Sequence, residues 1–209
     1  MNGTRQTMRG HGQMTSLPRL VLLALFFLGG VILGQVLAGR VPDATGDELT
    51  RYLTDYVRLG GELSAETALS ALVIYLRYPL LAFFLGFASV GIVLLPGVTV
   101  AYGFFLSFSV CCFTAAFGTD GVLLAFAVFG LRCLVTLPVF FLLAVPSWGK
   151  SAGLAAVSFG RGQRCAPVIY GRNYWLRAAA SLGVLLAGVC VDLFLSPLFL
   201  RLILERILT

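Results

Sequence analysis

The chain has little of the polar chemistry that enzyme active sites use. Only 11% of its 209 residues are charged, and its single histidine, His11, lies in the N-terminal tail. The apolar segments therefore hold no histidine for a metal site or for a Ser-His or Cys-His dyad. The five cysteines have no Cys-x-x-Cys spacing, and neither glycine-rich nucleotide-binding fingerprint occurs. These absences predict a protein that is not an enzyme and that holds no cofactor or metal.

Lysine is scarce as well, because Lys150 is the only lysine among fifteen basic residues. The basic residues stand singly around apolar segments rather than together on one face. The net charge of +6 therefore does not indicate nucleic-acid binding.

Apolar sequence is what the chain has in abundance. Its hydrophobic share is 59% and its mean hydropathy is +0.95, well outside the usual range of soluble domains. A helix crosses the roughly 30 Å hydrocarbon core in about 20 apolar residues. Five runs have nearly this length, and they cover residues 17–39, 79–95, 97–117, 121–146 and 178–199. They predict an all-α, multi-pass membrane protein with about five transmembrane helices.

The remaining residues leave little room for a separate soluble domain. We expect residues 1–16 to form a cytoplasmic tail and residues 17–209 to form a single membrane-embedded domain. Within that domain, residues 40–78 form an outer loop and residues 147–177 form a basic cytoplasmic loop.

Turn signals divide the apolar runs. Pro96-Gly97 predicts a turn between the second and third spans, which are either two full spans or a re-entrant pair. Gly118-Thr119-Asp120-Gly121 predicts a turn between the third and fourth spans. Pro138 and Pro197 are expected to kink or end their helices.

Charge placement predicts the orientation. The N-terminal tail and the 147–177 loop are basic and lack acids, whereas residues 41–68 hold six of the nine acids. Basic residues near span ends are retained in the cytoplasm. The N-terminus is therefore expected in the cytoplasm and the C-terminus outside the cell membrane. The first span is expected to be an uncleaved anchor rather than a signal peptide, since it is longer than a typical signal.

The outer loop contains an amphipathic pattern. Five apolar side chains recur at helical spacing, and they are Leu49, Tyr52, Leu53, Tyr56 and Val57. One interpretation is that this helix lies flat in the headgroup region, and the other is that it binds a partner protein. A second stripe follows, formed by Leu69, Leu72, Val73 and Leu76.

Two opposite charges occur within the apolar runs. Arg132 lies near the middle of the predicted fourth span, and Asp192 in the fifth is its only charged candidate partner there. An unpaired charge in this position costs at least about 2.5–3.5 kcal/mol. The pair is either structural, fixing the register of two helices, or part of a substrate or proton path.

The basic loop also has two interpretations. Its cations, with nearby aromatic residues, are typical of contacts with anionic lipids, and they are Lys150, Arg161, Arg164, Arg172 and Arg177. Alternatively, the loop docks a separate ATPase, as in a transporter permease.

Small residues recur at four-residue spacing in two spans. Gly30 and Gly34 form one such motif, and Ala179, Gly183 and Ala187 form the other. Such stripes let helices approach closely. We expect contacts within the chain, and contacts in a homo-oligomer are the alternative.

Five motifs follow one another within residues 49–146, and they are Leu49-x-x-Tyr52-Leu53, Tyr75-Leu76-Arg77, Leu85-Gly86-x-x-Ser89-Val90-Gly91, Gly97-x-x-x-Ala101-Tyr102-Gly103-Phe104 and Leu137-Pro138-Val139-Phe140. In their order and spacing, they resemble the stage II sporulation protein M family of integral membrane proteins. The chain departs from the family pattern at Leu131-Arg132-Cys133, where the family has a Pro-Gln-Asn run.

This resemblance implies a non-enzymatic scaffold. Members of the family hold two peptidoglycan hydrolases, stage II sporulation proteins D and P, at the septal membrane during engulfment. The partners implied are therefore these two membrane-anchored enzymes, in addition to membrane lipids. A permease subunit of an ABC-type transporter is the alternative function.

Overall fold

The computed structural model describes residues 16–40, 65–158 and 169–208, and nearly all of them are helical. The helices are α2 (Leu17–Ala38), α4 (Ala65–Leu85), α5 (Gly91–Ala125), α6 (Leu131–Ser158) and α7 (Arg172–Leu208), with a π-helical turn, η1 (Phe126–Gly130), between α5 and α6. The all-α fold predicted from the sequence is confirmed.

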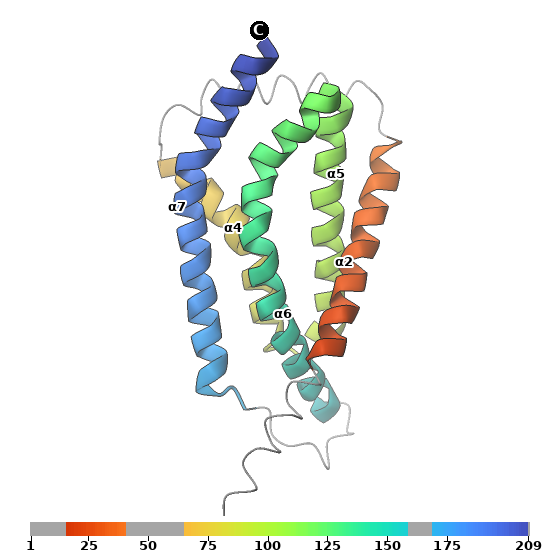
Figure 1. Cartoon of the computed structure of the whole chain (residues 1–209). Coiled ribbons are helices and arrows are strands. Elements are labelled where there is room, and N and C mark those ends of the chain that lie inside the picture. The colour runs from red at the N-terminus through yellow and green to blue at the C-terminus, as the bar shows by residue number, and fades with distance from the viewer. Residues whose placement is uncertain (1–15, 41–64, 159–168, 209) are drawn as a thin grey trace, which may run out of the picture.

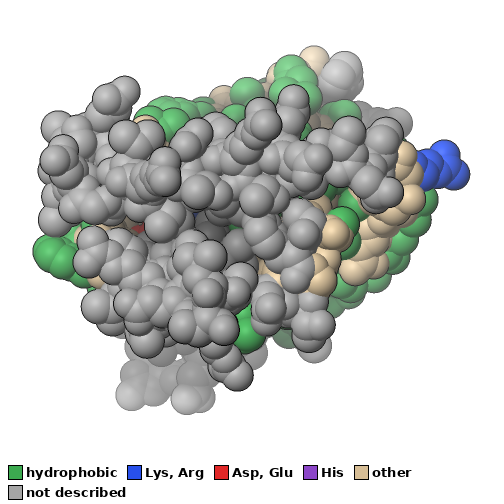
Figure 2. Space-filling view, turned by 90° about the horizontal axis from the view of Figure 1, so that it is seen from above, with side chains coloured by type: hydrophobic (Ala, Val, Ile, Leu, Met, Phe, Trp, Pro, Cys, Tyr) green, Lys and Arg blue, Asp and Glu red, His purple; other side chains and the backbone are tan. Residues whose placement is uncertain are grey.

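Four of these helices contain a segment that is long and apolar enough to cross a membrane. The segments are Leu17–Ala38, Gly91–Ala115, Arg132–Ser158 and Arg172–Leu195, whereas the apolar part of α4, Leu69–Leu85, is shorter. Large hydrophobic side chains cover the outward faces of the helices, and they line the rim of the molecule in Figure 2. Such a surface suits lipid rather than water, so the chain is a multi-pass membrane protein.

The helices form an antiparallel bundle with two distinct ends (Figure 1). The turn between α4 and α5 and the last residues of α6 lie at one end, which we call the Lys150 end. The connection from α5 to α6 and the last residues of α7 lie at the other, which we call the Asp192 end. Because α2, α5 and α7 run toward the Asp192 end, α2 starts and α7 finishes at opposite ends of the bundle.

The core consists of two clusters that share α4 and α6. On one side, Leu23 of α2, Leu95 of α5 and Phe140 of α6 are fully buried in the first cluster. On the other side, Tyr75 of α4 and Leu185 of α7 belong to the second cluster. Helices α4 and α6 therefore hold together the α2–α5 pair and α7.

Glycines allow α2 and α5 to approach closely. A Cβ atom on Gly30 would lie 2.1 Å from the Val100 carbonyl oxygen, and one on Gly103 would lie 2.3 Å from the Phe27 carbonyl oxygen. Gly34 is equally tight, since its Cβ would lie 2.6 Å from the Phe104 carbonyl oxygen. The expectation that Gly30 and Gly34 pack within the chain is confirmed.

The small-residue stripe of α7 does not behave in the same way. Ala179, Gly183 and Ala187 lie on the exposed face of α7, and a Cβ on Gly183 would meet nothing within 4 Å. The expectation of an intramolecular contact was wrong here. Gly188, one position further, packs against Val135 and Tyr75 instead.

The predicted boundary between the second and third spans was also wrong. The chain turns at residues 86–90, and Pro96 lies inside α5. A proline leaves the carbonyl four residues earlier without its helical hydrogen bond, and for Pro96 this is the carbonyl of Ile92. The indole Nε1 of Trp148 donates to that oxygen at 3.0 Å. A side chain from α6 therefore lets α5 continue through Pro96.

Helix α4 also begins before the predicted second span. Residues 65–78, expected in the outer loop, belong to α4. Of the predicted apolar stripe, Leu72 and Leu76 pack against the core, whereas Leu69 and Val73 are exposed. The buried face is formed instead by Ala71 and Tyr75.

The predicted turn at residues 118–121 is confirmed in part. Gly118 has non-helical backbone angles, with φ at 60°, which glycine adopts without a steric penalty. The chain reverses direction there before continuing into α6 (Figure 1).

The basic loop is shorter than residues 147–177. Residues 147–158 extend α6, and residues 172–177 begin α7. Neither Pro138 nor Pro197 ends its helix, because α6 and α7 continue past them to Ser158 and Leu208.

We expect Gly30→Ala to destabilise the protein by about 1–3 kcal/mol, because the added methyl group overpacks the contact with α5. The measurement is the free energy of unfolding of the purified protein in detergent. Gly29→Ala is the matched control, since a Cβ there meets nothing within 4 Å. Equal stability of the two variants would contradict the α2–α5 contact.

Candidate functional site

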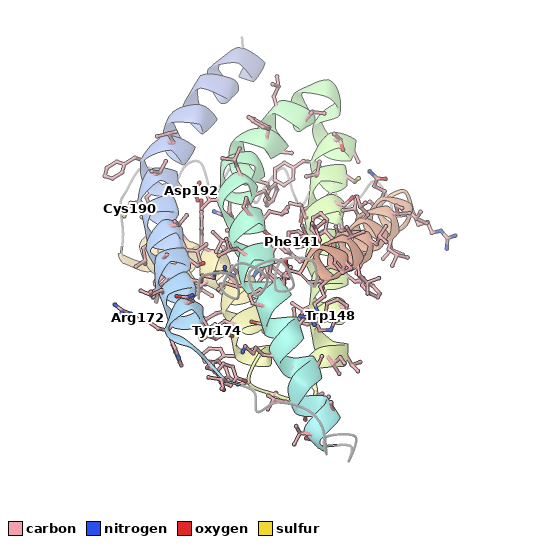
Figure 3. All side chains as sticks on the ribbon, turned by 60° about the horizontal axis from the view of Figure 1, so that its bottom comes forward. Phe141, Trp148, Arg172, Tyr174, Cys190 and Asp192 are labelled. Carbon is pink, nitrogen blue, oxygen red and sulfur yellow. The ribbon has the colours of Figure 1, made fainter. Side chains whose placement is uncertain are left out.

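An ion pair joins α6 to α7. The Nη2 atom of Arg132 donates to the Oδ2 atom of Asp192 at 3.0 Å. Both side chains are largely shielded, with 17% of Arg132 and 4% of Asp192 exposed. Figure 3 shows Asp192 directed toward α6, whereas Cys190 points away from the bundle. The structure thus brings together the two charges that the sequence suggested as partners.

Tyr75 of α4 is the third member of this cluster. The Arg132 guanidinium lies over its ring, 5.5 Å from the ring centroid, and the Tyr75 side chain is fully buried. A Cβ on Gly188 would lie 3.1 Å from the Cε1 atom of Tyr75, so the glycine leaves room for the ring. The cluster therefore connects three helices.

The cluster is not saturated with hydrogen bonds. Among the described residues, the Tyr75 hydroxyl, Arg132 Nε and Asp192 Oδ1 are buried without a partner. An unsatisfied polar group in an apolar surrounding costs on the order of 2–7 kcal/mol. These atoms therefore mark a place where a further polar group would be favoured.

The rise along α6 and α7 indicates how deep the Arg132–Asp192 pair lies in the membrane. At about 1.5 Å per residue, Arg132 is about 27 Å from Lys150 along α6, and Asp192 is about 30 Å from Arg172 along α7. Since Lys150 and Arg172 lie at the other end, the pair sits close to the far boundary of a roughly 30 Å core.

A cavity of about 220 Å³ opens beside the pair, between α4, α5 and α6. Its polar lining residues are Tyr75, Arg77, Tyr78, Tyr102, Ser109, Arg132 and Thr136, and its apolar ones include Phe105 and Phe129. We call this cavity the Arg132 crevice.

The deeper wall of the crevice is fixed by hydrogen bonds. The hydroxyls of Tyr102 and Thr136 lie 2.7 Å apart, and Thr136 donates to the carbonyl oxygen of Arg132 at 2.9 Å. Tyr102 stacks on Tyr78 with ring centroids 4.5 Å apart. The Arg77 guanidinium lies over the other ring of this stack, 4.6 Å from the Tyr78 centroid.

A second polar cluster closes the Lys150 end. The turn at residues 86–90 exposes carbonyls that side chains satisfy: Tyr170 donates to Gly86 at 2.9 Å, and Ser151 donates to Ala88 at 2.6 Å. The hydroxyls of Ser147 and Tyr174 lie 3.1 Å apart next to this turn. Figure 3 shows Tyr174 and Trp148 on the two flanks of α6. We assign this cluster a structural role, since its hydroxyls form hydrogen bonds with other groups of the protein.

The predicted lipid-contact residues at this end differ in their environments. Lys150 is half-buried, donates to the carbonyl of Ile169 and lies over the Tyr170 ring. Arg172 and Arg177 are exposed at the start of α7. Arg161 and Arg164 lie outside the described residues.

The predicted partner-binding helix, with Leu49, Tyr52, Leu53, Tyr56 and Val57, also lies outside the described residues. By contrast, neither Tyr102 nor Thr136 of the crevice was assigned to a site from the sequence. The sequence feature that could have indicated them is a hydroxyl group within an apolar run. This feature points to a site only when the structure shows that such hydroxyls from three helices lie together.

No group of three or more His, Cys, Asp or Glu side chains in the described part of the chain is arranged to hold a metal ion. Compared with protein-family models, curated proteins and solved structures, the chain matches none of them.

We expect Arg132→Leu to destabilise the protein by about 3–5 kcal/mol, because it leaves the Asp192 carboxylate buried and unpaired. Arg132→Leu/Asp192→Leu should lose less, since neither charge then remains. The measurement is a double-mutant cycle of unfolding free energies in detergent. Additive losses would show that the two side chains do not stabilise each other.

Proposed function

We propose that this protein is a non-enzymatic membrane scaffold, similar to the stage II sporulation protein M family, that holds peptidoglycan hydrolases at the cell membrane. Its partners would be the membrane-anchored stage II sporulation proteins D and P. This proposal combines the family resemblance with the way in which the bundle presents its ends.

One observation carries the proposal. The predicted fifth span ends at residue 199, yet α7 continues to Leu208, about 14 Å further at 1.5 Å per residue. It does so at the Asp192 end, where α2 ends and α4 begins (Figure 1). The extension of α7 is therefore at the same end of the bundle as the end of α2 and the start of α4, between which the predicted partner-binding helix lies in sequence. This end is where we place the platform for partner proteins.

A scaffold for cell-wall enzymes must present its partner-binding end outside the cytoplasm. The distribution of basic residues supports this orientation. Arg19, Lys150 and Arg172 gather at the Lys150 end; Arg19 packs against Gly149, next to Lys150. Basic residues at span ends favour the cytoplasmic side. The Asp192 end, with the acidic residues of 41–68 beside it in sequence, then faces the cell wall.

A rigid bundle supports the role of an anchor. The glycine contacts between α2 and α5, the ion pair between α6 and α7, and the hydrogen bonds at the α4–α5 turn connect all five helices. A scaffold needs partners held at fixed positions, and packing of this kind resists rearrangement.

We expect a tagged copy, crosslinked in native membranes and purified, to bring with it a lytic transglycosylase and an amidase. Tyr52→Ala/Tyr56→Ala should abolish this recovery, because it removes the aromatic side chains of the predicted partner-binding helix. Mass spectrometry of the captured proteins is the measurement.

The same experiment tests the competing function. Arg172→Gln, at the opposite end of the bundle, is the control that should leave recovery of the hydrolases unchanged. If instead an ATP-binding subunit is recovered, and is lost when Arg161, Arg164, Arg172 and Arg177 are neutralised, the protein is a permease subunit and the scaffold proposal is wrong.

We expect a cysteine at position 209 to react with a membrane-impermeant maleimide in intact cells, and a cysteine at position 2 to react only after permeabilisation. The positive-inside rule places the two termini on opposite sides. Thr209→Cys and Asn2→Cys are made in a background in which the five native cysteines are replaced by alanine. The reverse labelling pattern would overturn the orientation.

A further inference from the structure

The Arg132 crevice contains donors that the protein does not use. The Tyr75 side chain is fully buried, and among the described residues neither its hydroxyl nor the buried Nε atom of Arg132 has a hydrogen-bond partner. Both residues line the crevice. Because lipid tails cannot accept hydrogen bonds, these two donors favour an acceptor group inside the crevice.

The charge of the crevice favours an anion. Arg132 is balanced by Asp192, but no carboxylate among the described residues lies against Arg77. Arg77 is exposed and lines the same crevice. One net positive charge therefore remains, carried by a guanidinium, whose donor geometry matches phosphate and carboxylate oxygens.

The position of the crevice points to an amphiphile. Arg132 lies close to one boundary of the hydrocarbon core, as its distance from Lys150 along α6 indicates. This is the depth at which lipid headgroups meet their chains. Phe105, which also lines the crevice, is 53% exposed on the lipid-facing surface of α5. A bound molecule can thus place a polar group between the arginines and lay an apolar chain over Phe105.

The size of the crevice limits what enters it. At about 220 Å³, it is smaller than the roughly 300–1,000 Å³ of a pocket that encloses a drug-sized ligand. It accommodates a headgroup rather than a whole lipid.

We propose that the Arg132 crevice binds the phosphate of an anionic phospholipid in the leaflet at the Asp192 end. Arg77 pairs with the phosphate, and the Tyr75 hydroxyl and Arg132 Nε donate hydrogen bonds to its oxygens. The acyl chains remain in the bilayer along Phe105. This site is independent of the scaffold proposal, since it uses no residue of the predicted partner-binding helix.

The test is titration of the purified full-length protein in detergent with short-chain phosphatidylglycerol, with bound lipid counted by native mass spectrometry. We expect one lipid to bind more tightly than the rest. Tyr75→Phe and Arg77→Gln should each weaken that binding about tenfold, the loss of one charge-assisted hydrogen bond. Arg172→Gln, an exposed arginine at the Lys150 end, is the matched control and should bind as the unchanged protein does.

Two further ligands identify the source of the phosphate. Short-chain diacylglycerol, which lacks the phosphate, should not occupy the site, and inorganic phosphate should compete only at far higher concentration. Equal binding of diacylglycerol, or displacement of the lipid by equimolar phosphate, would overturn the proposal. So would binding that neither substitution weakens.

A stability measurement separates loss of the site from loss of the fold. Because the Tyr75 hydroxyl has no partner in the described part of the chain, Tyr75→Phe should leave the lipid-free protein at least as stable as before. It should also abolish most of the stabilisation that added phosphatidylglycerol gives. A variant that is less stable without lipid, yet still gains the full stabilisation from lipid, would contradict the assignment.

Discussion

The structure depends on one constraint. The lipid interior offers no hydrogen bonds, so the protein must supply a donor for each backbone carbonyl that its helices leave free. Within apolar sequence, the helix is interrupted at the turn of residues 86–90, and Pro96 removes one backbone hydrogen bond from α5. Side chains from other helices supply the missing donors: Ser151 to the turn, and Trp148 to the carbonyl that Pro96 leaves free. The polar residues of α6 thus allow α4 and α5 to be joined by a short turn. The rest of the bundle is assembled around that hairpin.

Several residues of the motifs that carry the family resemblance have structural roles in this helix bundle. Gly86 and Gly91 flank the α4–α5 turn, where a Cβ atom would lie within 3 Å of neighbouring atoms, and Gly103 does the same for the α2–α5 contact. Tyr75 and Tyr102 line the Arg132 crevice. Arg132, where the sequence departs from the family pattern, lies in the same crevice. The bundle and the proposed lipid site therefore depend on different interactions. Glycine contacts and hydrogen bonds at the turn hold the bundle together, whereas the lipid site depends on charge.

Hydropathy was sufficient to predict the all-α membrane fold. Arg132 could be paired with Asp192 because Asp192 was its only charged candidate partner within the apolar runs. The boundaries of α4 and α5 could not be predicted, because Pro96-Gly97 is a strong local turn signal. The residue that overrides this signal is Trp148, which lies 56 positions after Ile92, the residue whose carbonyl it satisfies. The sequence likewise could not show whether the face with Ala179 and Gly183 is buried or exposed. Residue spacing shows that these residues share a face of the helix but not what that face contacts. The crevice escaped prediction for a related reason. Its hydroxyls come from three helices, and each is unremarkable in its own segment.

The α4–α5 turn also has a consequence for how the chain enters the membrane. The carbonyls of this turn and of Ile92, at the start of α5, accept hydrogen bonds from residues between 56 and 84 positions later in the sequence. During synthesis, α4 and α5 therefore emerge well before the side chains that complete their turn. Until α6 and Tyr170 follow, the exposed carbonyls at residues 86–92 must be hydrated, which keeps this hairpin at the membrane surface or beside the insertion machinery.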